Sequence, residues 1–230
     1  MFEKNDKTIK TKLLKFAKLF GNLVSQDRKG NKIVNITPDV KTLRGNSSQQ
    51  NRKKLRYHKT NLGGSIHSDG PQLNHPPKYV IMACVFQSKK GGDSIIVNTK
   101  KIYDYLKKFD KKNVKILKKK FIFEKRGFST KKNKIIKKPI FIEKKNKFLF
   151  RYLKDYVLKG YELSKIKLSD SEKKSLSNLD NLLDKRRFQK KYKLNSGDLI
   201  LLNNYYLAHG RSSFKIDQNR QRSIYRVWVN

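Results

Sequence analysis

The sequence predicts a mainly β protein with flanking helices, of the antiparallel β-sandwich or jelly-roll type. Short β-branched and aromatic runs recur along the chain, bounded by glycine and polar turn residues. Strands and helices do not alternate in the βαβ rhythm of a parallel sheet. Hydrophobic residues make up 36% of the 230 residues and aromatic residues 11%, which is enough for one core. We therefore expect a single domain over residues 1–230.

The N-terminal part predicts one helix followed by a loop. Gly21 stands where a left-handed C-terminal cap would end this helix. Residues 25–62 are polar, have no clear period and are interpreted as loop. The apolar residues that recur at helical spacing are Ile9, Leu13, Phe16, Ala17 and Phe20.

Two strands and a helix are predicted next. The runs "KYVIMACVFQ" (78–87) and "SIIVNT" (94–99) are separated by the turn "SKKGGD". Thr99 is a suitable N-cap for a helix over residues 100–109, in which Ile102 and Leu106 share an apolar face.

The second half of the chain predicts further strands and one more helix. Alternating apolar residues predict half-buried strands in residues 120–128 and 138–152. Ser169 and Glu172 form a capping box ahead of a leucine-rich helix. The stretch "SGDLILLNN" (196–204) predicts a turn and a buried strand, and "RSIYRVWV" (222–229) a last strand.

The formal net charge of +39 raises the alternative of a basic nucleic-acid-binding protein. Of the 57 basic residues, 45 are Lys and 12 are Arg, and they lie in every segment. Proteins that bind nucleic acid favour Arg for base contacts and concentrate charge on one face. The scatter indicates a compositional bias, so we expect no nucleic-acid partner.

The cellular setting is predicted from cysteine and from apolar runs. A single cysteine, Cys84, excludes an internal disulfide and fits a reducing compartment. The longest apolar run, residues 79–86, is far shorter than the roughly 20 residues of a membrane helix, and no signal-peptide pattern opens the chain. We expect a cytoplasmic protein with no membrane partner.

His67 and Asp69, in "GGSIHSDGPQLNHPP" (63–77), are candidate metal ligands. In an extended segment the side chains at i and i+2 project from the same face and can bind one ion. His209 follows a predicted strand and precedes a glycine, so it is the candidate third ligand. Two histidines and one carboxylate are the ligand set of non-haem Fe(II) oxygenases. His58 and His75 are alternative ligands or plain surface residues.

An H-x-D triplet alone is a weak signal, but three blocks of this sequence resemble the taurine dioxygenase (TauD/TfdA) family of Fe(II)- and 2-oxoglutarate-dependent oxygenases. The wider superfamily includes clavaminate synthase and γ-butyrobetaine hydroxylase. The blocks are "HSDGPQLNHPPKYVIMACVFQSKKGGDSIIVNT", "GDLILLNNYYLAHGRSSF" and "RSIYRVWV". The resemblance implies a double-stranded β-helix, in agreement with the jelly-roll prediction.

The resemblance also implies roles for single residues. It makes His67, Asp69 and His209 the iron ligands. Arg222, 13 residues after the distal histidine, matches the arginine that binds the far carboxylate of 2-oxoglutarate. Ser94 stands where the family commonly has a threonine that contacts the same carboxylate. Arg226, four residues beyond Arg222, shares its strand face and is a candidate for binding an anionic substrate group or for supporting the cosubstrate, with a solvated surface charge as the equal alternative.

The implied activity is hydroxylation of a small polar substrate, anionic or zwitterionic, with release of succinate and CO₂ and with Fe(II), 2-oxoglutarate and O₂ as cofactors. An oxygenase acting on nucleic acid finds no aromatic-rich binding motif to support it. A jelly-roll metal protein without oxygenase activity would leave Arg222 and Ser94 without a role. The chain is shorter at its start than the family leads us to expect, which suggests a truncated or minimal form. Oligomeric state is not predicted.

Overall fold

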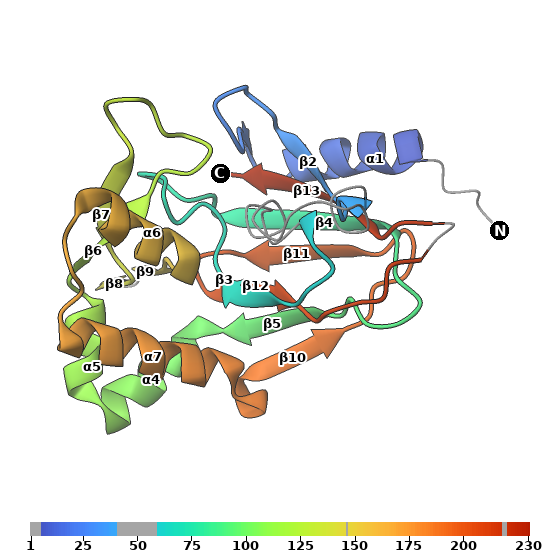
Figure 1. Ribbon diagram of the computed structural model, residues 1–230. Coiled ribbons are helices and arrows are strands. Elements are labelled where there is room, and N and C mark those ends of the chain that lie inside the picture. Colours follow the sequence, from blue (N-terminus) through green and yellow to red (C-terminus); the bar gives the residue numbers. More distant parts are fainter. Residues whose placement is uncertain (1–5, 41–58, 146, 218–219) are drawn as a thin grey trace.

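A computed structural model of the chain describes residues 6–40, 59–145, 147–217 and 220–230. The two larger antiparallel sheets lie one above the other, with helices on the outer side of each (Figure 1), and β6-β7 and β8-β9 form two further two-stranded sheets. The elements are α1 (Asp6–Lys18), β1 (Leu23–Val24), β2 (Ile33–Ile36), β3 (Gly64–His67), β4 (Tyr79–Phe86), β5 (Ser94–Asn98), α4 (Thr99–Phe109), α5 (Lys111–Leu117), β6 (Lys120–Glu124), β7 (Ile135–Pro139), β8 (Phe141–Lys144), β9 (Lys147–Phe150), α6 (Lys154–Ser164), α7 (Asp170–Asp184), the 3-10 turn η2 (Arg186–Phe188), β10 (Gln189–Tyr192), β11 (Leu199–Asn203), β12 (Leu207–Arg211) and β13 (Ser223–Val229).

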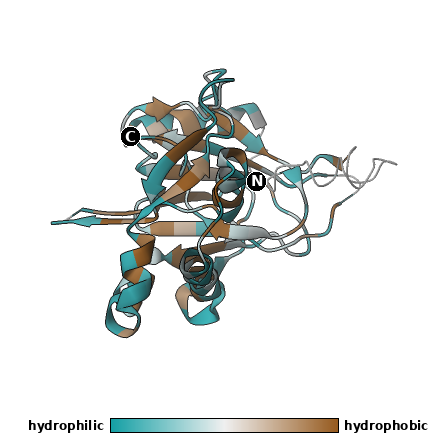
Figure 2. Cartoon of the chain, turned by 60° about the vertical axis from the view of Figure 1, so that its left-hand side comes forward, coloured by the Kyte–Doolittle hydropathy of each residue, from teal (hydrophilic) through white to brown (hydrophobic). Residues whose placement is uncertain are grey.

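The first sheet has the strand order β1-β13-β4-β11, and β2 also pairs with β13. Strand β4 is apolar at every position because both of its faces are covered. Its odd-numbered residues 81, 83 and 85 pack toward α1, and its even-numbered residues 80, 82 and 84 pack toward the second sheet. Figure 2 shows the apolar residues gathered in the strands.

The second sheet has the order β10-β5-β12-β3. Ile96 and Leu207 pack against the inner face of the first sheet. The opposite face, including Val97 and Ala208, packs against the helical layer formed by α4, α5 and α7. Strands β4 and β5 are confirmed near the predicted positions, but they belong to different sheets, so the glycine-rich segment between them crosses from one sheet to the other.

The capping box of α7 is confirmed: the Glu172 main-chain N–H donates to Ser169 Oγ and the Glu172 carboxylate accepts from the Ser169 N–H. The predicted cap of α4 is wrong by one residue. Asn98 is the N-cap, because its side chain accepts from Lys101 N–H at 3.1 Å. The hydroxyl of Thr99 donates instead to the carbonyl of Tyr206 at 2.8 Å.

Other boundaries differ from the sequence prediction. Part of the predicted loop over residues 25–62 is the edge strand β2, whose residues are mostly half-buried and therefore lack an alternating pattern. Helix α1 ends at Lys18, and Gly21, with φ of +136°, follows two residues of turn. The helices α5 and α6 were not predicted from the sequence. Within the part of the chain that is described, no helix combines the length and apolar character needed to cross a membrane.

Candidate metal centre and adjoining pockets

Two of the predicted ligands come from paired strands of the second sheet. His67 is the last residue of β3 and His209 lies in the middle of β12. The antiparallel register places the two residues directly opposite each other. Their ring centroids are 4.6 Å apart, although 141 residues separate them in the chain.

Asp69 follows β3 and completes the group. Its Oδ1 lies 3.8 Å from His67 Nε2, and its Oδ2 lies 3.8 Å from His209 Nε2. One ligand atom from each of the three residues lies within 4.8 Å of the others, and all three side chains are buried. His75 is exposed and lies outside this group, while His58 lies outside the described residues.

The protonation states of the three groups suit a divalent metal. Burial lowers the pKa of His67 and lowers that of His209 to about 3, so both imidazoles are neutral near pH 7. Burial alone would raise the pKa of Asp69, but the charge of Arg226 and the hydrogen bond from Trp228 lower it, so the carboxylate is ionised. The Nδ1 of His67 lies 2.8 Å from the carbonyl of Ser65, and donation there leaves a lone pair on Nε2. Two neutral imidazoles and one carboxylate are ligands that Fe(II) accepts.

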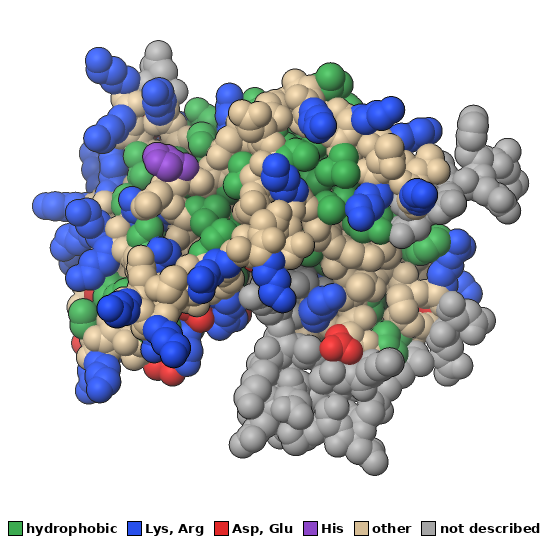
Figure 3. All heavy atoms as spheres, turned by 90° about the horizontal axis from the view of Figure 1, so that it is seen from above, with side chains coloured by type: hydrophobic (Ala, Val, Ile, Leu, Met, Phe, Trp, Pro, Cys, Tyr) green, Lys and Arg blue, Asp and Glu red, His purple; other side chains and the backbone are tan. Residues whose placement is uncertain are grey.

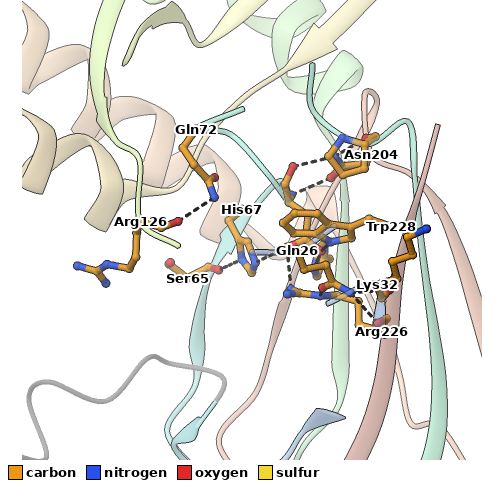
Figure 4. A network of polar contacts seen from close by, with 12 residues as sticks. Gln26, Lys32, Ser65, His67, Gln72, Arg126, Asn204, Arg226 and Trp228 are labelled. Atoms are coloured by element: carbon orange, nitrogen blue, oxygen red, sulfur yellow. Dashed lines mark hydrogen bonds and ion pairs between the residues drawn. The ribbon is translucent and has the colours of Figure 1, made fainter. Parts of the chain in front are cut away.

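The facing sheet orients Asp69. Arg226 Nη1 donates to Oδ1 at 2.9 Å, and Trp228 Nε1 donates to Oδ2 at 2.9 Å. Both donors project from the inner face of β13, two residues apart (Figure 4). In the sequence, the only signal for this polar role of Trp228 is its i+2 relation to Arg226.

Gln26 fixes Arg226 in turn. Its Oε1 accepts from Arg226 Nε at 2.8 Å, and its Nε2 donates to the Arg226 carbonyl at 2.9 Å. Arg226, predicted as a substrate-binding residue, therefore lies beside the candidate metal ligands with Nε and Nη1 already bonded. No sequence signal identified Gln26, which lies in the predicted loop.

Asn204 holds the segment that follows Asp69. Its Oδ1 accepts from the Asp69 N–H at 2.8 Å, and its Nδ2 donates to the carbonyls of Asp69 and Pro77 at 2.9 and 2.8 Å. The side chain has no exposed surface and is bonded at both ends, so it rigidly joins the two ends of the segment 69–77 to the end of β11.

A pocket on one side of the triad contains the predicted cosubstrate residues. Its wall includes His209, Ser94, Arg222 and the unpredicted Arg211. Arg222 is buried, and its Nε donates to Gln87 Oε1 at 3.0 Å. A second pocket contains the side chains of His67 and Asp69 and extends toward residues 70–72 and Arg226. The triad therefore adjoins two pockets, each with two arginines in its wall.

Arg151 and Tyr152, which follow β9, make structural contacts. The guanidinium of Arg151 donates to the carbonyls of Pro71 at 2.7 Å, Asn74 at 3.4 Å and Leu73. The hydroxyl of Tyr152 donates to Asp180 at 2.7 Å.

Comparisons with solved structures agree on the fold. An asparagine oxygenase in complex with Fe(II), (2S,3S)-3-hydroxyasparagine and succinate superposes with a TM-score of 0.71 at 13% identity, covering 94% of this chain and 63% of that protein. The non-haem iron oxygenase OrfP in complex with Fe and α-ketoglutaric acid superposes with a TM-score of 0.67 at 12% identity, covering 95% and 63%. At such identities the likeness concerns the fold alone.

Sequence comparisons give the family. The human γ-butyrobetaine dioxygenase and its orang-utan (Pongo abelii) counterpart are each 28% identical over 166 residues, which is 70% of this chain. The chain matches 42% of the length of these relatives. The profile of the family "Taurine catabolism dioxygenase TauD, TfdA family" matches residues 10–228, almost the entire sequence. The chain therefore belongs to the TauD/TfdA family.

Proposed function

We propose that this chain is an Fe(II)- and 2-oxoglutarate-dependent dioxygenase that hydroxylates a small polar substrate, with His67, Asp69 and His209 as the iron ligands. The observation that carries the proposal is the buried group of two neutral imidazoles and one carboxylate with ligand atoms within 4.8 Å. Three protein ligands would leave coordination positions of an iron ion for small molecules. When bound, iron and 2-oxoglutarate supply O₂ activation and C–H hydroxylation with release of succinate and CO₂.

We assign the cosubstrate to the pocket that contains Ser94 and Arg222. The buried guanidinium of Arg222 is suited to the far carboxylate of 2-oxoglutarate, because a planar guanidinium offers two parallel hydrogen bonds. Ser94 contributes a hydroxyl from β5. The relatives whose solved structures hold α-ketoglutaric acid or succinate support this choice of cosubstrate.

Other residues of the chain prepare the centre for the reaction. Arg226 and Trp228 fix the orientation of the Asp69 carboxylate, and Asn204 fixes the backbone that carries it. Burial of His67 and His209 keeps water from the imidazoles and keeps them neutral. Such preorganisation holds the ligands in place without rearrangement during turnover.

We also infer that the two sheets form one double-stranded β-helix and that residues 1–230 act as one domain. The TM-scores of 0.71 and 0.67 with two oxygenases support this inference. The antiparallel order of both sheets agrees with a jelly-roll topology.

The net charge of +39 favours a second candidate, a nucleic-acid-binding protein with an incidental metal triad. Figure 3 shows Lys and Arg side chains spread across one face of the molecule among neutral and apolar ones, which supports a compositional origin. Binding of single- and double-stranded DNA at rising salt separates the two candidates. A nucleic-acid function requires affinity that persists at physiological salt and falls with the slope expected for several phosphate contacts.

The first test is anaerobic titration with Fe(II) and 2-oxoglutarate, followed by the visible charge-transfer band of the chelate. The band should appear only when both are added and should weaken in Arg222→Ala. Arg220→Ala, in which an exposed arginine of the same segment is removed, is the matched control and should leave the band unchanged. Absence of the band in the wild type would overturn the proposal.

A second test concerns the ligand assignment. Asp69→Ala should lose metal binding and turnover of 2-oxoglutarate, because only the two imidazoles would remain. Full turnover in Asp69→Ala would remove Asp69 from the ligand set.

A further inference from the structure

The wall of the pocket beside His67 and Asp69 has two chemically different regions. One region offers a hydrogen-bond donor and the other offers an acceptor. Its volume is about 50 Å³, enough to admit the polar end of a small ligand. Figure 4 shows the side chains of Gln72 and Arg226 on either side of His67 in that view. Both residues line this pocket, so one ligand can contact both.

At one place the wall offers a positively charged donor. Arg226 uses Nε for Gln26 and Nη1 for Asp69. Among the described residues, its Nη2 has no hydrogen-bond partner. A carboxylate or a similar anion accepts strongly from a guanidinium N–H.

At the other place the wall offers an acceptor. Gln72 is 3% exposed, and its Nε2 donates to the main-chain carbonyl of Arg126 at 3.2 Å. This bond fixes which end of the amide is the oxygen. The Oε1 is buried and has no hydrogen-bond partner among the described residues. A buried unpaired oxygen costs free energy that a donor group of a ligand recovers.

The aromatic rings of the pocket are already engaged with cations. The guanidinium of Arg126 lies over the ring of Tyr156, with a distance of 5.4 Å to its centroid, and that of Arg226 lies over Trp228 at 5.1 Å. A quaternary ammonium is recognised by free aromatic faces and offers no N–H. The wall therefore suits an N–H donor better than a trimethylammonium group.

We propose that the substrate of this pocket carries both an anionic group, bound at Arg226, and an amine or amide N–H, bound at Gln72 Oε1. Gln72 is then the residue that selects the nitrogen group. This inference rests on the proposed function, because it treats the pocket as the substrate side of the metal centre. It also predicts that this pocket does not prefer γ-butyrobetaine, the trimethylammonium compound in the name of the human relative.

The test compares three probes with the same carbon chain: γ-aminobutyrate, γ-butyrobetaine and butyrate. Binding is measured anaerobically with the protein loaded with Fe(II) and 2-oxoglutarate, from the change each probe causes in the visible band. We expect γ-aminobutyrate to bind at least about tenfold more tightly than either of the others. In Gln72→Leu this preference should vanish, and butyrate should bind no more weakly than before.

Two variants keep the test interpretable. Gln189→Leu makes the same change on β10, remote from the pocket, and should retain the preference. Gln72→Met keeps the length of the side chain and replaces Gln72→Leu if that variant does not fold. A preference that is absent in the wild type, or that persists when the amide is removed, overturns the inference. Failure of the band itself would instead overturn the proposed function, so the two failures are distinguishable.

Discussion

Replacing Trp228 with Phe tests whether the indole positions the carboxylate of Asp69. The Nε1 of Trp228 lies 2.9 Å from Oδ2, and the two residues are 3% and 4% exposed. A hydrogen bond to a charged group contributes about 1.5–3 kcal/mol, which corresponds to about 10- to 150-fold in a binding constant. Phe keeps an apolar ring without the N–H, so we expect the affinity for Co(II) to fall by about 10- to 100-fold.

The assay is calorimetric titration of the protein with Co(II), a substitute for Fe(II) that resists oxidation. Tyr152→Phe is the matched control, because it removes another buried donor to a carboxylate, the 2.7 Å bond to Asp180 on α7. That variant should lose stability but keep its affinity for Co(II). Wild-type affinity in Trp228→Phe, or an equal loss in Tyr152→Phe, would refute the positioning role of the indole.

Three further predictions follow from single contacts. Trp228 is the only tryptophan of the chain, so titration with Co(II) should quench its fluorescence and saturate at one equivalent; unchanged fluorescence in metal-bound protein would contradict the site. Gly160→Ala should lower the free energy of unfolding by about 1–3 kcal/mol, because the new Cβ would lie 2.4 Å from the carbonyl oxygen of Ile122, and an unchanged urea midpoint would contradict this contact. Ser169→Ala should lower it by about 1 kcal/mol, measured the same way, because one half of the capping box with Glu172 is lost.

The elements predicted correctly carry their signal in adjacent residues. The run over 79–86 is long, apolar and β-branched, and only a strand covered on both faces accommodates it. The capping box at Ser169 and Glu172 lies within four residues. By contrast, β2 is a short edge strand with half-buried residues, and its only support is pairing with β13 about 190 residues later, so its local sequence resembles a loop.

The residues of the candidate site that belong to a local sequence motif could be predicted. The residues that come into contact only in the folded chain could not. His67 and Asp69 were recognised from their spacing, and His209 from the block around it. Gln26 is 200 residues from its partner Arg226, and no local pattern connects them. The hydrogen bond from Trp228 to Asp69 was not predicted either, because a buried tryptophan near the end of a strand is usually interpreted as a core residue.

The alternation of β13 links the core to the electrostatics of the site. Arg226 and Trp228 face inward toward Asp69, while Tyr225 and Val227 face α1. A slip of one residue in the pairing of β13 with β4 would exchange these two sets. The ionised Asp69 would then remain buried without its cation and its indole donor, and an uncompensated buried charge costs about 3–5 kcal/mol. The two-residue alternation of β13 that fills both cores therefore also selects the register in which the Asp69 carboxylate is bonded to Arg226 and Trp228.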